Sequence, residues 1–254
     1  MKDPVIDKVG STTRQAAEPR VIKAYIRQRF SPLTFTLLSL YLFLFINEGF
    51  PFNTTGVIDL VLIAVFLFTM RLYDDLQNIP FDLLTDRIYT DPAAAKTLKG
   101  VFLGAALCLV VLASLVDPGS GAMVLLFLVA NHTLYHLLVG RSSWRYFLPL
   151  IKYTFLAGLL AGDWKLSHLA LFFAFLTYDL IDDSTFPLPR WAAILTSLAA
   201  FGLLLGTVSV DHFFLAGIAA AIATPLAATR TKYSAYAFLL LLLLAKLIDP
   251  LYEI

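Results

Sequence analysis

Three aspartates and an asparagine gather in residues 71–82, directly after a long apolar segment. Asp74 precedes Asn78 by four residues. Asp75 precedes the same asparagine by three, and Asp82 follows it by four. If the helix continues through this stretch, the spacing turns these oxygens towards one side. Convergent carboxylates repel each other unless a cation lies between them, and hard oxygen ligands suit Mg2+. The stretch therefore predicts a cation site, and the alternative is the solvated end of a helix.

A second acidic group ends a later apolar segment. It comprises Asp179, Asp182 and Asp183, and it repeats the pattern of the first group: a Tyr-Asp pair with a further oxygen ligand four residues after the aspartate. One acidic helix end can arise by chance, but two with equal spacing favour a metal-centred site between two walls. On this interpretation the acidic residues of both groups hold the metal.

The composition indicates an integral membrane protein. Of the 254 residues, 59% are hydrophobic and 15% are charged, whereas soluble domains hold about 45–50% apolar and about 25% charged residues. Basic tracts interleaved with aromatic residues are absent, so a nucleic-acid partner is not expected. Cys108 is the only cysteine, so no internal disulfide can form.

Residues 1–30 form a basic N-terminal arm. They hold seven Lys or Arg residues but lack the apolar core of a secretory signal. We interpret them as a cytosolic arm with an amphipathic end, followed by one transmembrane domain over residues 31–254. The connections between apolar segments are too short for a separate soluble domain.

The apolar segments predict an all-α polytopic membrane protein, a bundle of nine transmembrane helices around a central cavity. A spanning helix needs about 17–25 largely apolar residues, and the first and last segments are short, so eight spans are an alternative. We expect the cavity to open to the cytosol and sideways into lipid. The nine segments centre on residues 33–46, 57–70, 101–116, 122–139, 147–161, 166–180, 191–208, 213–228 and 233–247.

The distribution of basic residues predicts the orientation. With the N-terminus in the cytosol, seventeen of the nineteen Lys and Arg residues lie on the cytosolic side, and Lys165 and Lys246 lie on the other. This one-sided distribution supports nine spans. It also brings both acidic groups to the cytosolic side, where their side chains can meet.

With this topology and these motifs, the chain resembles the UbiA superfamily of intramembrane prenyltransferases. In that family the motif after the second span commonly reads N-D-x-x-D-x-x-x-D, and the motif after the sixth reads D-x-x-x-D. Residues 74–82, DDLQNIPFD, stand in register with the first motif. Arg71 before an acid pair is similar to members whose first motif begins R-x-x-D-E, and Asp179 with Asp183 has the spacing of the second.

Three features depart from the family pattern. Asp74 stands at the family's asparagine position, and Asn78 stands at an aspartate position. Pro80 lacks an N–H group and interrupts the helix, so a helix that starts there would hold Asp82 in its first turn. Many members carry Lys-Asp where this chain has two aspartates at 182–183, so a basic contact to the diphosphate would come from elsewhere.

The resemblance implies a Mg2+-dependent transfer of a prenyl group from a prenyl diphosphate to an acceptor in the membrane. An aromatic compound or a quinone precursor is the candidate acceptor. The implied catalytic residues are Asp74, Asp75, Asp179 and Asp183. The implied metal ligands are these four together with Asn78, Asp82 and Asp182.

Six basic residues are candidate ligands of the diphosphate, because this anion needs cations beyond Mg2+. Alternatively they only orient the protein, since the positive-inside rule also places basic residues on the cytosolic side. Members of the family carry a basic residue after the fourth span, which favours Arg141. The six candidates are Arg71, Lys96, Lys99, Arg141, Arg145 and Lys152.

Two other functions are compatible with parts of the pattern. A terpene cyclase of the same fold would ionise a prenyl diphosphate and use no acceptor. A cation-coupled transporter or a non-catalytic binder is a candidate from another class. Transporters tend to place carboxylates near the bilayer midplane on broken helices, whereas the clustered acids here lie at one surface.

Polar residues in the segment 122–139 are candidates for a third role. His132 and His136 have the i,i+4 spacing of a zinc pair, but a third ligand is not near them in the sequence. Polar residues in a membrane helix usually face the bundle interior. Asn131, Tyr135 and His136 could therefore line the substrate pocket, or these side chains could form hydrogen bonds between helices.

The predicted topology can be tested with reporter fusions. Fusions after Arg87, Arg141 and Arg190 should report the cytosol, and fusions after Asp117 and Lys165 should report the opposite side, because the positive-inside rule orients each span. A cytosolic signal after Lys165 would separate the two acidic groups and contradict a shared metal site.

Overall fold

The computed structural model describes residues 18–47, 54–82, 86–138, 144–182, 188–205 and 231–248, with isolated positions between 218 and 229. Every regular element in these ranges is helical, and no strand occurs in them. The prediction of an all-α protein is confirmed for this part of the chain.

The helices follow one another with short connections. Their bounds are α1 Glu18–Arg29, α2 Pro32–Asn47, α3 Thr54–Gln77, α4 Ile79–Asp82, α5 Pro92–Val116, α6 Pro118–Leu138, α7 Trp144–Ala161, α8 Leu169–Asp182, α9 Arg190–Leu205 and α11 Lys232–Ile248. Two short 3-10 turns complete the described elements: η1 Ile88–Thr90 and η2 Leu166–His168.

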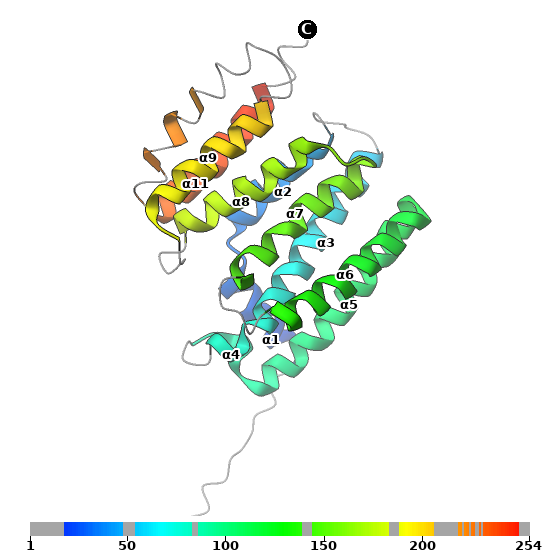
Figure 1. Cartoon of the computed structure of the whole chain (residues 1–254). Coiled ribbons are helices and arrows are strands. Elements are labelled where there is room, and N and C mark those ends of the chain that lie inside the picture. The colour runs from blue at the N-terminus through cyan, green and yellow to red at the C-terminus, as the bar shows by residue number, and fades with distance from the viewer. Residues whose placement is uncertain are drawn as a thin grey trace, which may run out of the picture.

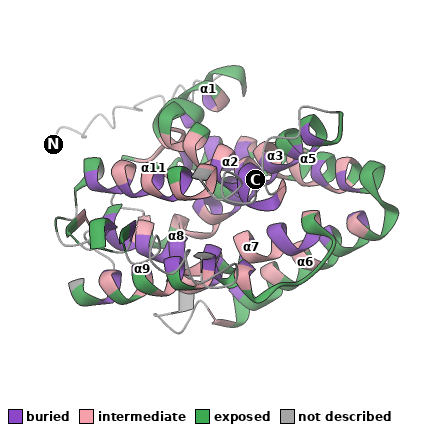
Figure 2. Cartoon of the chain, turned by 90° about the horizontal axis from the view of Figure 1, so that it is seen from above, coloured by how far each residue is buried: buried purple, intermediate pink, exposed green. Residues whose placement is uncertain are grey.

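The long helices form two rows. Figure 2 shows α11, α2, α3 and α5 side by side in one row and α9, α8, α7 and α6 in the other. Neighbours within each row pack on each other, and α5 with α6 and α8 with α11 join the rows. Most buried apolar side chains lie between the rows, in one continuous core.

Three described helices, α3, α5 and α6, are long and apolar enough to cross a membrane. The α1–α2 pair, bent by 74°, could form a fourth, broken span. Shorter apolar helices occupy Tyr146–Ala161, Trp191–Leu204 and Tyr233–Leu247. The three long helices coincide with predicted apolar segments and have the length and composition of membrane spans. The shorter helices also coincide with predicted apolar segments but do not pass this test by themselves.

Exposed apolar side chains support this interpretation. On α5 the exposed residues Leu103, Leu107, Val111 and Leu115 recur every four positions and form a stripe along the helix. On a protein in water such a continuous stripe would be an aggregation or binding surface. In a bilayer the same stripe contacts lipid tails.

The helix breaks at the end of α3, where the sequence predicts an interruption. Gln77 is its last residue, Asn78 forms a turn, and α4 begins at Ile79, one residue before Pro80. Asp82 lies in the first turn of α4, as the position of the proline predicts. The break places α4 at the same end of the bundle as α1 (Figure 1).

The described part of the N-terminal arm packs against this end. Val21 and Tyr25 of α1 are buried in a small apolar cluster with Leu72, Tyr89 and Leu98. The side chain of Gln28 also donates to the Asp86 carbonyl oxygen (2.8 Å) and accepts from the Ile88 N–H (2.9 Å). Helix α1 is therefore fixed to α3, η1 and α5 at once.

The small apolar cluster around Val21 and Tyr25, called the arm cluster below, provides a test of this packing. Leu98→Ala removes a fully buried side chain from the cluster, and we expect a loss of unfolding free energy of about 2–5 kcal/mol. Leu103→Ala, on the exposed stripe of the same helix, is the matched control and should change stability little. Unfolding in mixed detergent micelles measures both variants, and equal losses would contradict the packing of α1 on α5.

Candidate active site

A cavity of about 280 Å3 lies where the α1–α2 junction meets α3, α7, α8 and α11. Its described wall combines cations, carboxylates and aromatic rings. The charged side chains are Arg29, Arg71, Lys152, Asp179 and Asp182. The aromatic side chains are Phe30, Phe35, Tyr153, Phe175, Tyr178 and Tyr236.

Asp75 is a buried carboxylate that several donors surround. Its side chain is only 2% exposed. Arg29 of α1 forms a bidentate contact with it: Nε donates to Oδ2 at 2.8 Å, and Nη2 donates to Oδ1 at 2.6 Å. The Tyr25 hydroxyl donates to Oδ2 at 2.9 Å, and Nε of Arg71 lies 3.7 Å from the same oxygen. A buried carboxylate is stable only with such compensation.

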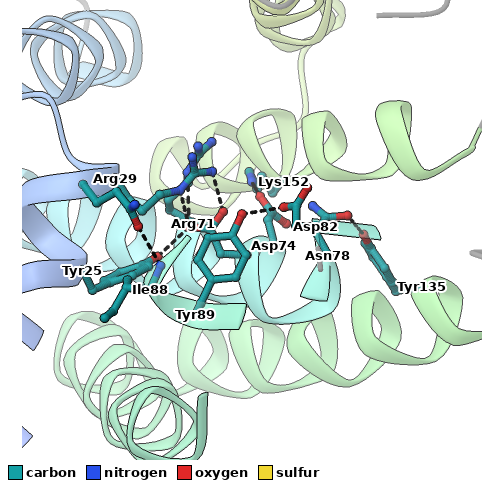
Figure 3. A network of polar contacts seen from close by, with 12 residues as sticks. Tyr25, Arg29, Arg71, Asp74, Asn78, Asp82, Ile88, Tyr89, Tyr135 and Lys152 are labelled. Atoms are coloured by element: carbon teal, nitrogen blue, oxygen red, sulfur yellow. Dashed lines mark hydrogen bonds and ion pairs between the residues drawn. The ribbon is translucent and has the colours of Figure 1, made fainter. Parts of the chain in front are cut away.

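Asp74 forms a second ion pair, with Lys152 of α7. Both side chains are largely buried. The lysine ammonium also lies 5.3 Å from the ring centre of Tyr153, a cation–π contact. Figure 3 shows Tyr25, Arg29 and Arg71 gathered on one side of the network and Lys152 with Asp74 on the other.

The other two members of the first acidic group contact tyrosines. Asn78 Oδ1 accepts from the Tyr135 hydroxyl at 3.1 Å, and Asp82 accepts from the Tyr89 hydroxyl. Burial, followed by this hydrogen bond, raises the pKa of Tyr89, so its phenol stays protonated and remains a donor. These contacts connect the break after α3 to α6 and η1.

The second acidic group faces the cavity from α8. Asp179 and Asp182 both belong to its wall, because their i,i+3 spacing puts them on one side of the helix. Asp183 lies outside the described residues. Among the residues that are described, no three acidic, histidine or cysteine side chains are arranged to hold a metal ion by themselves.

The basic candidates divide into two sets. Arg71 and Lys152 lie on the cavity wall, beside the acidic groups. Lys96 and Lys99 are exposed on α5 and do not belong to that wall. Arg141 lies outside the described residues, and for Arg145 the structure describes only the backbone, in the first turn of α7.

The polar residues of α6 lie apart from the cavity wall. Tyr135 is buried and binds Asn78 instead. The Tyr73 hydroxyl lies 3.2 Å from Nδ1 of His132, so this histidine joins α6 to α3. Asn131 is half-buried and His136 is exposed. The contacts of Tyr135 and His132 are the interhelical hydrogen bonds that were one of the sequence-based alternatives.

Arg29 and Tyr25 were not among the residues singled out from the sequence. Val21, Tyr25 and Arg29 recur every fourth residue, which places them on one face of α1. This face packs against the end of α3 and carries an apolar, then an aromatic, then a charged side chain. An arginine that ends such a buried face signals a buried acidic partner.

Comparison with known proteins finds no matching family model, no matching curated protein and no matching solved structure. The resemblance to the UbiA superfamily therefore rests on the two motifs and on the pattern of apolar segments.

The Asp74–Lys152 pair yields a prediction for stability. Lys152→Met leaves a buried carboxylate without its cation, and such a loss costs about 3–5 kcal/mol of unfolding free energy. Adding Asp74→Asn to that variant removes the uncompensated charge and should restore most of the loss. Unfolding in detergent measures both variants. A double variant that is no more stable than Lys152→Met would contradict direct pairing.

Proposed function

We propose that the protein catalyses Mg2+-dependent transfer of a prenyl group from a prenyl diphosphate to an acceptor within the membrane. One observation carries the proposal: cations, carboxylates and aromatic rings meet in a single cavity at the end of the bundle that holds α1 and α4. A prenyl diphosphate has the complementary chemistry, an anionic head joined to an apolar chain.

The cationic side of the cavity suits the anionic head. Arg29, Arg71 and Lys152 lie within reach of one ligand in the cavity. Arginine binds phosphate oxygens with two parallel hydrogen bonds, and lysine acts as a point charge. Of the six Lys and Arg candidates from the sequence, only Arg71 and Lys152 lie on the described part of the cavity wall. Together with Arg29 they define the diphosphate-binding set of the proposal.

The acidic side of the cavity fits Mg2+. This ion is usually bound by one or two carboxylates together with substrate phosphates, and Asp179 and Asp182 supply two carboxylates on the wall. A three-carboxylate cage in the protein is therefore not required. Bound Mg2+ would neutralise the charge that develops on the departing diphosphate.

The chemical step breaks the bond between the first prenyl carbon and a diphosphate oxygen, which keeps the electron pair. Arg29, Arg71 and Lys152 stabilise the departing anion through charge and hydrogen bonds. The allylic cation remains beside the aromatic wall, where ring faces stabilise positive charge. A nucleophilic atom of the acceptor then forms the new bond to carbon and loses a proton.

We also propose that the chain crosses the membrane nine times around a central cavity, with the N-terminus and the site on the cytosolic side. The basic residues support this orientation, since α1 and the end of α3 carry cations at one end of the bundle. A water-soluble diphosphate head then enters from the cytosol, and the prenyl chain extends towards lipid.

A terpene cyclase of the same fold is the second candidate. The aromatic wall favours it, because Tyr153 stacks on Phe175 with ring centres 3.7 Å apart beside the charged residues. A cation held next to such faces can be captured by double bonds of its own chain. Product analysis separates coupled from cyclised prenoids, and diphosphate release reports ionisation in both cases.

Removal of one wall carboxylate tests the proposed function. Asp179→Asn keeps the size of the side chain but removes its charge, and we expect Mg2+-dependent diphosphate release to fall at least 100-fold. The assay uses the purified protein in nanodiscs with prenyl diphosphates of several lengths, with and without a quinone precursor.

Asp163→Asn is the matched control. Asp163 is an exposed aspartate paired with Lys165 beyond the end of α7, away from the cavity wall. It should leave diphosphate release unchanged. Full activity in Asp179→Asn, or no release by the wild type from any prenyl diphosphate, would contradict the proposed function.

A further inference from the structure

Arg29 links the N-terminal arm to the candidate site. It is the last residue of α1, its side chain is 13% exposed, and it belongs to the cavity wall. Its guanidinium also stacks over the Tyr89 ring at 5.5 Å. The side chain therefore has one edge on Asp75 and access to the cavity.

The Arg29–Asp75 contact has the geometry with which arginine also binds phosphate. Two nitrogens meet two oxygens, at 2.8 and 2.6 Å. The planar guanidinium can form such bidentate hydrogen bonds with a phosphate group as well as with a carboxylate. The Arg29 guanidinium could thus bind Asp75 when the cavity holds no anion and bind the anion when one is present.

We propose that Arg29 is a diphosphate ligand supplied by the N-terminal arm and that Asp75 holds it in the ligand-free protein. This inference rests on the proposed function, since it takes the diphosphate of the donor as the ligand. When the anion binds, the guanidinium shifts from the carboxylate to phosphate oxygens. Asp75 then keeps the hydrogen bond from Tyr25 and the nearby charge of Arg71.

The backbone of α1 can stay in place during this exchange. Val21 and Tyr25 bury their side chains in the arm cluster, and Gln28 holds the backbone on both sides of Arg87. Only the arginine side chain has to move. Fixing the helix lowers the entropic cost of ordering this cation for the ligand.

A purely structural role for Arg29 makes a different prediction. If Arg29 only docks α1 on α3, removing either partner loosens the arm and weakens anion binding. If Asp75 instead holds a ligand-binding arginine, removing the Asp75 charge frees that arginine and strengthens binding of an anion without metal. The two roles thus predict opposite signs for Asp75→Asn.

The experiment measures binding of inorganic pyrophosphate to the full chain in nanodiscs, in the presence of a metal chelator. Arg29→Gln should weaken binding about 10- to 100-fold, the loss expected for hydrogen bonds to a charged group. Asp75→Asn should strengthen it several-fold. Arg29→Lys keeps the charge without the two-pronged geometry and should lie between the wild type and Arg29→Gln. Arg27→Gln, an exposed arginine on the same helix, is the control and should bind like the wild type.

Several results would overturn the inference. These are absence of pyrophosphate binding by the wild type, equal affinity in Arg29→Gln and the wild type, or weaker binding in Asp75→Asn. A parallel diphosphate-release assay separates this failure from that of the proposed function. Release by the wild type with an unchanged KM in Arg29→Gln refutes the role of Arg29 alone. Pyrophosphate binding through Arg29 without release from any prenyl diphosphate refutes the prenyl-transfer proposal alone.

Discussion

The structure depends on the compensation of two adjacent buried carboxylates at the end of α3. An uncompensated buried charge costs several kcal/mol, so Asp74 and Asp75 each need a cation close by. Neighbouring side chains on a helix point in different directions, and the two partners therefore come from different elements. Asp75 takes Arg29 from α1, and Asp74 takes Lys152 from α7. These two ion pairs tie three elements together at one end of the bundle.

The same compensation shapes the chemistry of the cavity. The carboxylates of the first acidic group are engaged behind the wall, while their cations face the cavity beside Asp179 and Asp182. The two acidic groups therefore differ in position, although their spacing in the sequence is alike: Asp74 and Asp75 lie behind the cavity wall, and Asp179 and Asp182 belong to it.

The sequence predicted what depends on local chemistry. Apolar segments indicated the helices because lipid and core burial require them, and Pro80 indicated the break after α3 because its ring and missing N–H act on neighbouring residues. The partner of Asp75 lies 46 residues away along the chain, and no local pattern connects two such positions. The four-residue spacing of Val21, Tyr25 and Arg29 puts these side chains on one face of α1, but it does not identify the surface that this face meets.

The basic residues that the positive-inside rule treats alike differ in how far their side chains are buried. The positive-inside rule predicts the same side of the membrane for Lys96, Lys99 and Lys152 and takes no account of their surroundings. Lys96 and Lys99 are exposed, whereas Lys152 is 5% exposed and paired. An exposed lysine keeps its hydration and can serve orientation at little cost. A buried lysine has lost that hydration and is stable only next to an anion. For Lys152 this anion is Asp74. An anionic ligand in the cavity would therefore meet a cation that has already lost its hydration.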